Sequence, residues 1–493
     1  MPRHRRNDRF HGIQKQNGQR LAKKYVNQRI FATCFISNPI KIGNFAPKLQ
    51  TIRITDKQIM TEKSNRKTAI SLFCSSGIGD LGLKANNVDT IVACELLPER
   101  MKLFLHNHHE AKGFCGDIQE LKDDIITYYK NHYQESPFIV MATPPCQGMS
   151  SNGMGKLLNN LKKGIRPEFD PRNRLIIPAV EIVKALKPDW VIFENVPNMT
   201  NTMIEDGNGV INIIDYINRE LGDDYVGRPQ VIDVADYGVP QHRNRLITVL
   251  TRTANGKEEY KKSKTLIPEP THAAQQTMFA KKWLTLRDVI SDLPAISSKP
   301  GENVDPHNPL HKVPVLDEAK LSWVHNTPEG QTAMNNQCIN PDCMYQGNTL
   351  HGARHDSQGV NRANTETPLY CEKCGALLPR PYTVDKKTGE KRIMKAFTSA
   401  YKRMSWDVPA STLTQNFQYA CSDNKLHPSQ DRVLSLYEGL VIQTIAQYPY
   451  SFEINGKIVS DGLIRDTIGE SVPPLLTDKI VKHIIDISRK QVK

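Results

Sequence analysis

The sequence predicts an α/β protein built on an open, doubly wound parallel sheet. Short unbroken apolar runs recur along residues 68–250 and stop at polar or glycine-rich turns, as buried parallel strands do. The first run leads into a turn of small residues, which allows a backbone to approach a nucleotide-like ligand closely. An acid follows about 20 residues later at the end of the next run, where doubly wound folds bind ribose hydroxyls.

Length and composition describe a large chain with no obvious membrane segment. It has 493 residues, 24% charged and 39% hydrophobic, enough to bury a core divided among about two to four domains. No apolar run approaches the roughly 18 residues of a transmembrane helix, and the N-terminus lacks a secretory signal, which predicts a cytoplasmic protein. Ten cysteines, scattered apart from one cluster, favour catalytic or metal-binding thiols over a disulfide framework.

The excess positive charge lies in a basic N-terminal extension, residues 1–66. Fifteen Lys and Arg stand there against three Asp and Glu, so this arm carries +12 of the net charge of +13. Such side chains can neutralise phosphates and give sequence-independent affinity for nucleic acid. A solvated tail is the alternative interpretation, and an organelle transit peptide is a third that the low serine content disfavours.

The first half of the predicted sheet carries a candidate cofactor site. Residues 68–73 form the first strand, the turn 74–82 follows it, and the run 90–94 ends at Glu95. Asp117 precedes a helical pattern that extends to about residue 133. By default Asp117 is a helix N-cap, although it can also accept a hydrogen bond from an adenine amino group.

Cys146 lies just beyond the carboxyl end of the buried run 138–142, after a pair of prolines. Ligands bind and chemistry occurs at this edge of an open α/β sheet, although a single free cysteine is more often a core residue. A helical pattern covers 172–185, and the run 189–193 then delivers Glu194 to the same edge. A further strand near 230–234 leads to alternating polar residues that share one face of an extended segment: Gln241, Arg243 and Arg245.

In this order, these motifs resemble the C5-cytosine DNA methyltransferase family. The motifs are Phe73 to Gly77, Glu95, Asp117, Pro144-Pro145-Cys146-Gln147, Glu194-Asn195-Val196, Gln241-x-Arg243-x-Arg245 and Ser471-Val472-Pro473-Pro474. The resemblance covers residues 68–250 and about 404–490. It implies a Rossmann-like, S-adenosylmethionine-dependent methyltransferase domain with a smaller inserted target-recognition domain. The expected parts are catalytic residues 67–251, a recognition domain at 252–403, and residues 404–493 completing the catalytic domain.

The resemblance also assigns a role to each motif. Cys146 is the expected nucleophile, because addition of its thiolate to cytosine C6 makes C5 able to attack a methyl donor. Glu194 holds a proton at N3, and Arg243 and Arg245 hold the base and the catalytic loop. The target cytosine must leave the stack by base flipping. The expected cofactor-binding residues are Phe73, Gly77, Glu95, Asp117, Pro144, Ser471 and Val472.

Two residues depart from the family pattern. Ser75 replaces the first glycine of the cofactor turn, which is acceptable if its φ is negative. Glu470 replaces an asparagine beside Ser471, which leaves that contact with the cofactor open. The segment 432–438, with Thr412 before it, resembles a motif that is mostly structural and organises the recognition domain.

The middle region contains two cysteine pairs. Cys338 and Cys343 are separated by four residues, and Cys371 and Cys374 follow after 27 more, with Gly375 next. This spacing predicts a four-cysteine zinc ribbon, the alternative being four unconnected thiols. His351 and His355 can replace a ligand but are expected to be loop residues. The basic residues of this region suit contacts with DNA phosphates, or else form a solvated face.

The expected partner is therefore duplex DNA, bound by a monomer. If the source is bacterial, the resemblance implies a cytosolic, nucleoid-associated enzyme working with restriction or phage-defence proteins. Three other functions remain open: a tRNA cytosine-5 methyltransferase, a non-catalytic DNA-binding protein, and a thiol redox protein suggested by Cys371-x-x-Cys374. The intact set of Cys146, Glu194, Arg243 and Arg245 argues against the second of these.

Overall fold

The computed structural model describes residues 66–145, 170–355, 361–363, 366–394 and 399–490. All of these residues belong to one compact unit, residues 60–493. The basic N-terminal arm up to residue 65, Cys146 and Gln147 lie outside the described residues.

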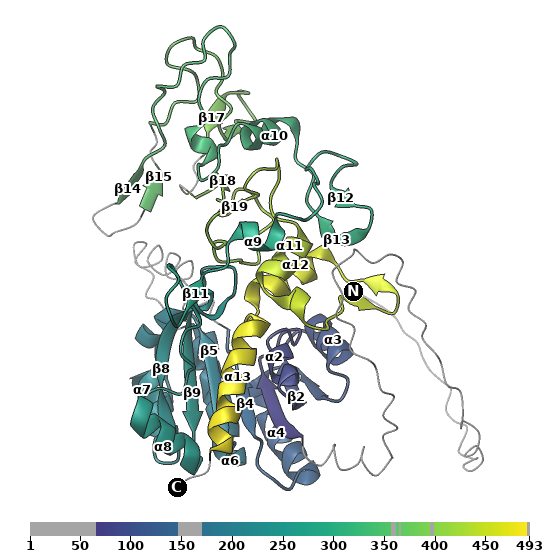
Figure 1. Ribbon diagram of the computed structural model, residues 1–493, viewed down its shortest axis with the longest axis vertical. Helices are drawn as coiled ribbons and strands as arrows, with labels where there is room; N and C mark the ends of the chain where they lie inside the picture. The colour runs from purple at the N-terminus through teal and green to yellow at the C-terminus, as the bar shows by residue number, and fades with distance from the viewer. Residues whose placement is uncertain (1–65, 146–169, 356–360, 364–365, 395–398, 491–493) are drawn as a thin grey trace, which may run out of the picture. The chain divides into compact units, whose positions relative to one another are not determined.

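Within the described residues, seven strands form a central sheet in the order β3-β2-β1-β4-β5-β9-β8 (Figure 1). They are β1 (Lys67–Leu72), β2 (Val88–Glu95), β3 (Lys112–Cys115), β4 (Ile139–Ala142), β5 (Trp190–Asn195), β8 (Val226–Asp233) and β9 (Asn244–Thr251). Neighbours among β1 to β5 are parallel, whereas β9 runs antiparallel to both β5 and β8. The strand order reverses between β1 and β4, and open α/β sheets bind ligands beyond the carboxyl ends of the strands at such a point. The doubly wound α/β fold is thus confirmed.

Burial of both faces explains why the central strands are continuous apolar runs. Every residue of β4 and of β5 is buried, and the two strands pair from Ile139 with Trp190 to Ala142 with Phe193. Polar side chains begin where this pairing ends, at Thr143 and Glu194. The sheet therefore collects the polar residues at one edge.

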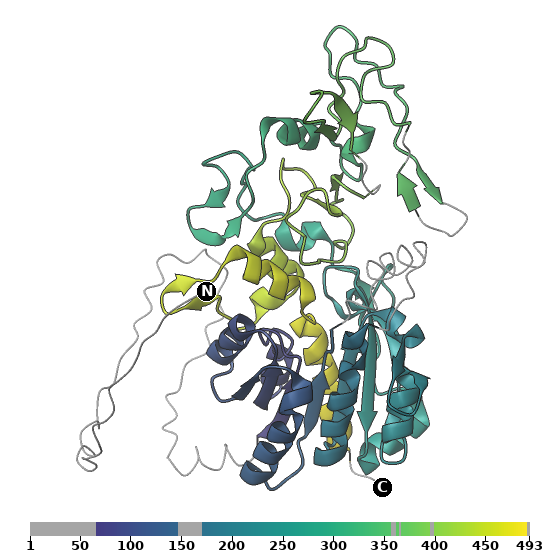
Figure 2. The same ribbon diagram turned by 180° about the vertical axis from the view of Figure 1, so that it is seen from behind.

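Helices cover both faces of the sheet. On one face lie α4 (Ile118–His132), α6 (Ile176–Leu186) and α7 (Ile213–Leu221). The other face carries α2 (Leu81–Ala85), α8 (Ala254–Ser263) and the C-terminal α13 (Pro474–Arg489), which Figure 1 shows in front of the sheet and Figure 2 behind it. Leu476, Ile480 and Ile484 of α13 share an apolar core with Trp190. The C-terminal helix α13 thereby packs on the central sheet.

Two elements differ from the simple pattern. The helical segment expected at 172–185 consists of η1 (Pro171–Leu175) followed by α6, and Pro178 is accommodated because it lies in the first turn of α6. The strand β3 was not expected, since its four residues are only partly buried at the edge of the sheet. The helix α3 (Pro98–Asn107) connects β2 to β3.

Two larger apolar cores lie outside those of the central sheet. One core joins Ile78 and Leu103 to Leu286 and Ile464, and the other centres on Trp323. The remaining elements are η2 (Pro197–Asn201), β6 (Met203–Glu205), β7 (Val210–Asn212), η3 (Val234–Tyr237), β10 (His272–Ala273), β11 (Lys281–Lys282), α9 (Leu286–Ile290), β12 (Val304–Asp305), β13 (Asn308–Lys312), α10 (Glu318–His325), η4 (Ala333–Asn335), β14 (Ala353–His355), β15 (Asn361–Ala363), β16 (Tyr382–Val384), β17 (Lys391–Ile393), β18 (Lys402–Arg403), β19 (Asn424–Leu426), α11 (Leu436–Ile442), η5 (Ile445–Gln447), β20 (Glu453–Ile454), β21 (Lys457–Ile458) and α12 (Asp461–Glu470).

Candidate active site

The turn after β1 contains three residues with left-handed backbone. Phe73, Ser75 and Gly77 have φ angles of 59°, 48° and 80°. A negative φ is the condition for accepting serine at position 75, and this condition is not met. The left-handed conformation costs a non-glycine residue about 1–2 kcal/mol. The hydroxyls of Ser75 and Ser76 are buried and have no hydrogen-bond partner among the described residues. Strain and unused polar groups together mark a site that a ligand completes.

Glu95 links this turn to the end of β2. Its Oε2 accepts a hydrogen bond from the Ser75 N–H at 3.0 Å, and its Oε1 accepts one from the Leu97 N–H at 3.0 Å. Each oxygen keeps a further lone pair for ribose hydroxyls. Leu96 is 60% exposed and places apolar surface beside these acceptors. The sequence gives no sign of Leu96, because only its exposure distinguishes it from a core leucine.

A buried histidine and a buried aspartate stabilise the turn through hydrogen bonds. The His108 Nε2 lies 2.9 Å from the Gly77 carbonyl oxygen, and Asp80 accepts hydrogen bonds from the hydroxyls of Ser71 and Thr90. Burial raises the pKa of Asp80 and lowers the pKa of His108. A Cβ atom at position 77 would lie 2.6 Å from the His108 ring. Packing as well as φ therefore requires glycine there.

Two other expected cofactor residues have structural contacts. Asp117 caps α4 by accepting a hydrogen bond from the Gln119 N–H at 2.9 Å. The carbonyl of Phe73 accepts a hydrogen bond from the Thr143 hydroxyl at 3.0 Å, which ties the cofactor turn to the end of β4. A contact between Asp117 and an adenine amino group stays a prediction.

The segment that leads to Cys146 is held by the end of β5. The Asn195 side-chain amide donates to the Pro144 carbonyl at 3.0 Å, and its oxygen accepts from the Val196 N–H at 2.8 Å. Asn195 is almost completely buried. Cys146 itself lies outside the described residues, two positions beyond this carbonyl. Asn195 thus fixes the end of the described segment before Cys146, a contact that the sequence motif alone does not reveal.

Glu194 and Arg245 form an ion pair at the same edge. The Arg245 Nε lies 2.9 Å from the Glu194 Oε1, and the two side chains are only 14% and 10% exposed. Glu194 pairs across the sheet with Ile247, two residues from Arg245, so both charged side chains project from one face. The guanidinium therefore orients the carboxyl group in a largely desolvated position.

Arg243 has a different environment from Arg245. Its guanidinium is buried and donates hydrogen bonds to the carbonyls of Leu413 at 2.7 Å, Gly469 at 2.9 Å and Ser471 at 3.1 Å. Gln241 faces the same segment, since its side chain accepts from the Leu413 N–H at 3.2 Å. The two arginines of this motif therefore have different partners. Arg243 binds the C-terminal part of the chain, and Arg245 binds Glu194.

The C-terminal motif lies against the cofactor turn. Val472 is buried, and its Cβ would be 3.6 Å from a Cβ atom at Gly79. Ser471 accepts hydrogen bonds from Gln443 at both its carbonyl and its hydroxyl. Glu470 forms an ion pair with Arg100 of α3, and burial raises the pKa of Glu470. Arg100 therefore neutralises the charge of Glu470, the acid that departs from the family pattern.

The four cysteines of the middle region come together as predicted. Their sulfur atoms all lie within 4.8 Å of one another, with 3.7 Å between Cys338 and Cys374 and 3.9 Å between Cys343 and Cys371. Tetrahedral zinc with Zn–S bonds of about 2.3 Å requires sulfur atoms about 3.8 Å apart. Burial raises the pKa of the Cys371 thiol, but backbone hydrogen bonds from Cys374 and Lys373 lower it to about 6 overall. The distances between the four sulfur atoms therefore fit a zinc ion.

A buried arginine holds this cysteine module together. Arg380 donates to the carbonyls of Asn336, Thr349 and Pro368, which come from three separate segments. His351 is buried, and its Nδ1 lies 2.7 Å from the Thr367 hydroxyl, so it is a structural residue of the module and not a fifth ligand. The side chain of His355 lies outside the described residues.

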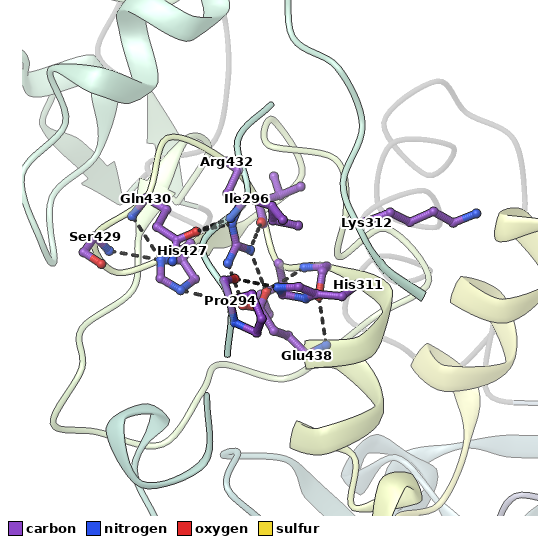
Figure 3. A network of polar contacts seen from close by, with 12 residues as sticks. Pro294, Ile296, His311, Lys312, His427, Ser429, Gln430, Arg432 and Glu438 are labelled. Carbon is purple, nitrogen blue, oxygen red and sulfur yellow. Dashed lines mark hydrogen bonds and ion pairs between the residues drawn. The ribbon is translucent and has the colours of Figure 1, made fainter. Parts of the chain in front are cut away.

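A second buried network joins the middle region to the C-terminal part (Figure 3). Arg432 donates to both carboxylate oxygens of Glu438 at 2.7 Å, and Glu438 also accepts from the Ser435 N–H in a capping box. The Nδ1 of His311 contacts the Ser435 hydroxyl at 2.8 Å and its Nε2 contacts the Pro294 carbonyl at 2.8 Å. This geometry agrees with the structural role expected for residues 432–438.

The fold and this edge of the sheet define an α/β enzyme that takes a nucleotide-like cofactor beside a Glu–Arg pair. The model of the C-5 cytosine-specific DNA methylase family matches residues 67–486, so the chain belongs to that family. The predicted family and the class of enzyme, a DNA (cytosine-5)-methyltransferase, are confirmed.

Individual relatives resemble the chain over most of its length. The type II methyltransferase M1.HgaI of Avibacterium volantium is 27% identical over 428 residues, which cover 85% of this chain and 98% of that protein. The type II methyltransferase M.AgeI of Thalassovita gelatinovora is 24% identical and covers 83% of this chain and 96% of its own. The solved methyltransferase EhMeth of Entamoeba histolytica has 12% identity and a TM-score of 0.48, covering 86% of this chain and all of that one.

Among the helices that the structure describes, none combines the length and apolar character needed to cross a membrane.

Proposed function

We propose that the protein transfers a methyl group from S-adenosylmethionine to C5 of a cytosine flipped out of a specific duplex DNA sequence. The observation that carries this proposal is the Glu194–Arg245 pair at the edge where Asn195 holds the segment leading to Cys146. The relatives M1.HgaI and M.AgeI are type II methyltransferases. They support a role in a restriction-modification system, with cognate restriction or defence proteins as partners.

The cofactor fits the strained turn beside β1 and β2. When bound, S-adenosylmethionine supplies an electrophilic methyl group. Glu95 offers carboxylate acceptors to its ribose, and the exposed Leu96 offers apolar surface to its adenine. The other residues that would hold it are Phe73, Gly77, Asp117, Pro144, Ser471 and Val472.

The chain's own residues act on the cytosine. The Cys146 thiolate forms a bond to C6 and so makes C5 nucleophilic. Glu194 holds a proton at N3, Arg245 keeps that carboxyl in place and stabilises developing charge, and Arg243 positions this edge through the C-terminal segment. After methylation, loss of the C5 proton and cleavage of the sulfur–C6 bond release Cys146.

The cysteine module belongs to the part of the chain that reads the DNA. One structural zinc ion held by Cys338, Cys343, Cys371 and Cys374 would stabilise it. Leu266 and Ile267 pack in the core of the catalytic sheet, and α9 packs with the C-terminal part. We therefore place the recognition domain at about residues 291–403, a shorter range than the expected 252–403.

Methyl transfer tests the proposal. The protein is incubated with labelled S-adenosylmethionine and either DNA lacking 5-methylcytosine or tRNA, and bisulfite sequencing then locates the product. We expect 5-methylcytosine in DNA at one sequence, none in tRNA, and no transfer by Cys146→Ser. Cys421→Ser, at an exposed free thiol, is the matched control and should remain active. Transfer to tRNA alone, or a fully active Cys146→Ser, would contradict the proposal.

A further inference from the structure

Two neighbouring residues are the most exposed large apolar side chains of the described chain. Met278 and Phe279 are each 90% exposed, whereas the next value, at Leu96, is 60%. They lie in the loop 274–280, which connects β10 to β11, and the exposed Lys281 and Lys282 follow directly. Isolated exposed apolar residues are common on protein surfaces, but an adjacent pair presented almost completely to solvent indicates a binding surface.

The loop is held in one conformation at its tip and at its base. At the tip, the Thr277 hydroxyl accepts hydrogen bonds from the Phe279 N–H at 3.2 Å and the Ala280 N–H at 2.9 Å. At the base, the Lys281 N–H donates to the Thr271 carbonyl at 3.0 Å, and the Trp283 N–H donates to the Ala273 carbonyl at 2.9 Å. A loop ordered in this way loses little conformational entropy on binding.

The base of the loop is attached to the catalytic edge of the sheet. The Trp283 indole donates to Asp236 at 2.8 Å and packs against the ring of His242, with 4.7 Å between ring centroids. His242 immediately precedes Arg243, and β11 lies beside the end of β9 at which Arg245 meets Glu194 (Figure 1). The loop that carries Met278 and Phe279 is therefore attached at the edge of the sheet where Arg245 meets Glu194.

We propose that Met278 and Phe279 form an apolar wedge that stacks on or between bases of the substrate duplex, close to the flipped cytosine. Proteins that deform DNA insert apolar side chains of this kind between base steps. Lys281 and Lys282 supply the positive charge that adjacent phosphates require, and Lys479, whose Nζ lies 2.6 Å from the Thr271 hydroxyl, adds to it. The inference rests on the proposed function only for the position of the wedge relative to the target base.

Tryptophan fluorescence tests the contact without requiring catalysis. Phe279→Trp places an indole at the tip, and Ile458→Trp places one at an exposed position of β21 as a control. The chain has four tryptophans, so the wild-type signal is subtracted. We expect mixed-sequence duplex DNA to quench the indole introduced at position 279 and heparin to leave it unchanged, because stacking needs bases. No quenching by the duplex, or equal quenching by heparin or in the control, overturns the proposal.

Removal of the wedge measures its contribution. We expect Met278→Ser with Phe279→Ser to weaken binding of a duplex carrying the methylated sequence by about 5- to 100-fold, as loss of one base-stacking contact does. Binding of S-adenosylhomocysteine and the melting temperature should not change, and Val304→Ser is the matched exposed control. Unchanged duplex affinity overturns the wedge. Quenching at position 279 by a protein that methylates no DNA would instead refute the proposed function and leave the wedge standing.

Discussion

The central sheet and the proposed recognition region satisfy their buried backbone groups differently. In the sheet, β8 and β9 pair continuously over eight residues, and β4 and β5 are buried throughout. In the recognition region, pairs such as β16 and β17 extend over three residues. Buried arginines bind many of the remaining carbonyls there. Arg403 alone donates to the carbonyls of Val324, Thr327, His427 and Gln430.

This difference concentrates the stability of the recognition region in a few side chains. A strand pair distributes its hydrogen bonds over many residues, so that one substitution removes little. When one guanidinium binds several separate segments, a single substitution of that arginine removes all of these hydrogen bonds together. The four cysteines concentrate stability in the same way if they hold zinc.

The largest expected effect is the loss of zinc. Cys371→Ala should release about one equivalent of metal and unfold the cysteine module locally, because structural zinc contributes about 10–16 kcal/mol in zinc-finger peptides. Metal analysis and hydrogen exchange measure the two results, and β4 and β5 should keep their protection. Cys421→Ala is the control thiol outside the cluster. Equal metal content in both variants would refute the zinc site.

Next is the buried ion pair between Arg432 and Glu438. Arg432→Met leaves an unpaired buried carboxylate and should lower the free energy of unfolding by about 3–5 kcal/mol, measured by denaturant titration. Adding Glu438→Gln should restore part of that loss. Arg287→Met breaks an exposed pair with Asp407 and should cost less than about 1 kcal/mol. Equal effects of the two arginine substitutions would remove the contrast between buried and surface pairs.

The same network predicts sensitivity to acid. Burial, followed by Arg432, lowers the pKa of His427 to about 3, and Arg432 holds the pKa of Glu438 at about 2 against the effect of burial. Both pKa values are depressed, so both groups contribute stability that is present above their unfolded pKa values and lost as the pH falls. Glu438 favours protonation of His427 and Arg403 disfavours it, but burial and Arg432 outweigh the effect of Glu438.

For His427, the loss begins near pH 6.5 and continues to about pH 3, at about 1.4 kcal/mol per pH unit. His427→Asn keeps an acceptor for the N–H groups of Ser429 and Gln430 but does not titrate. Its free energy of unfolding should therefore fall about 2 kcal/mol less than that of the wild type between pH 6.5 and pH 5. If the free energy of unfolding changes with pH in the same way in both proteins, the pKa of His427 is not lowered in the folded state.

The smallest effect lies in the catalytic part, at Ser75. Ser75→Gly relieves the left-handed backbone strain but increases the entropy of the unfolded chain, so the net gain should be about 0.5 kcal/mol. Ser76→Gly is the adjacent control, and it should destabilise the protein, because Ser76 is not among the described residues with positive φ. Thermal melting distinguishes the two, and a destabilised Ser75→Gly would argue that the serine side chain outweighs the strain.

Sequence reasoning was most successful where one face of an element had to be buried. The apolar runs predicted the central strands, and the polar residues that interrupt them predicted Glu194 and Glu95 at the correct edge. It did not predict β3, which is only partly buried, or the positive φ of Ser75. It also predicted one shared face for Gln241, Arg243 and Arg245, but it could not show that Arg243 binds the C-terminal segment while Arg245 binds Glu194.

By itself, the sequence determined the doubly wound class and the grouping of the four cysteines, because burial periodicity and ligand spacing are local properties of the chain. The family followed from the resemblance of its ordered motifs. Only the tertiary structure decided that Arg243 binds the C-terminal segment, that Arg100 neutralises Glu470, and that Arg380 links three segments. These contacts join residues far apart in the chain, and a guanidinium can reach any carbonyl that packing brings near it. The partner of a buried charge is therefore a consequence of the whole fold.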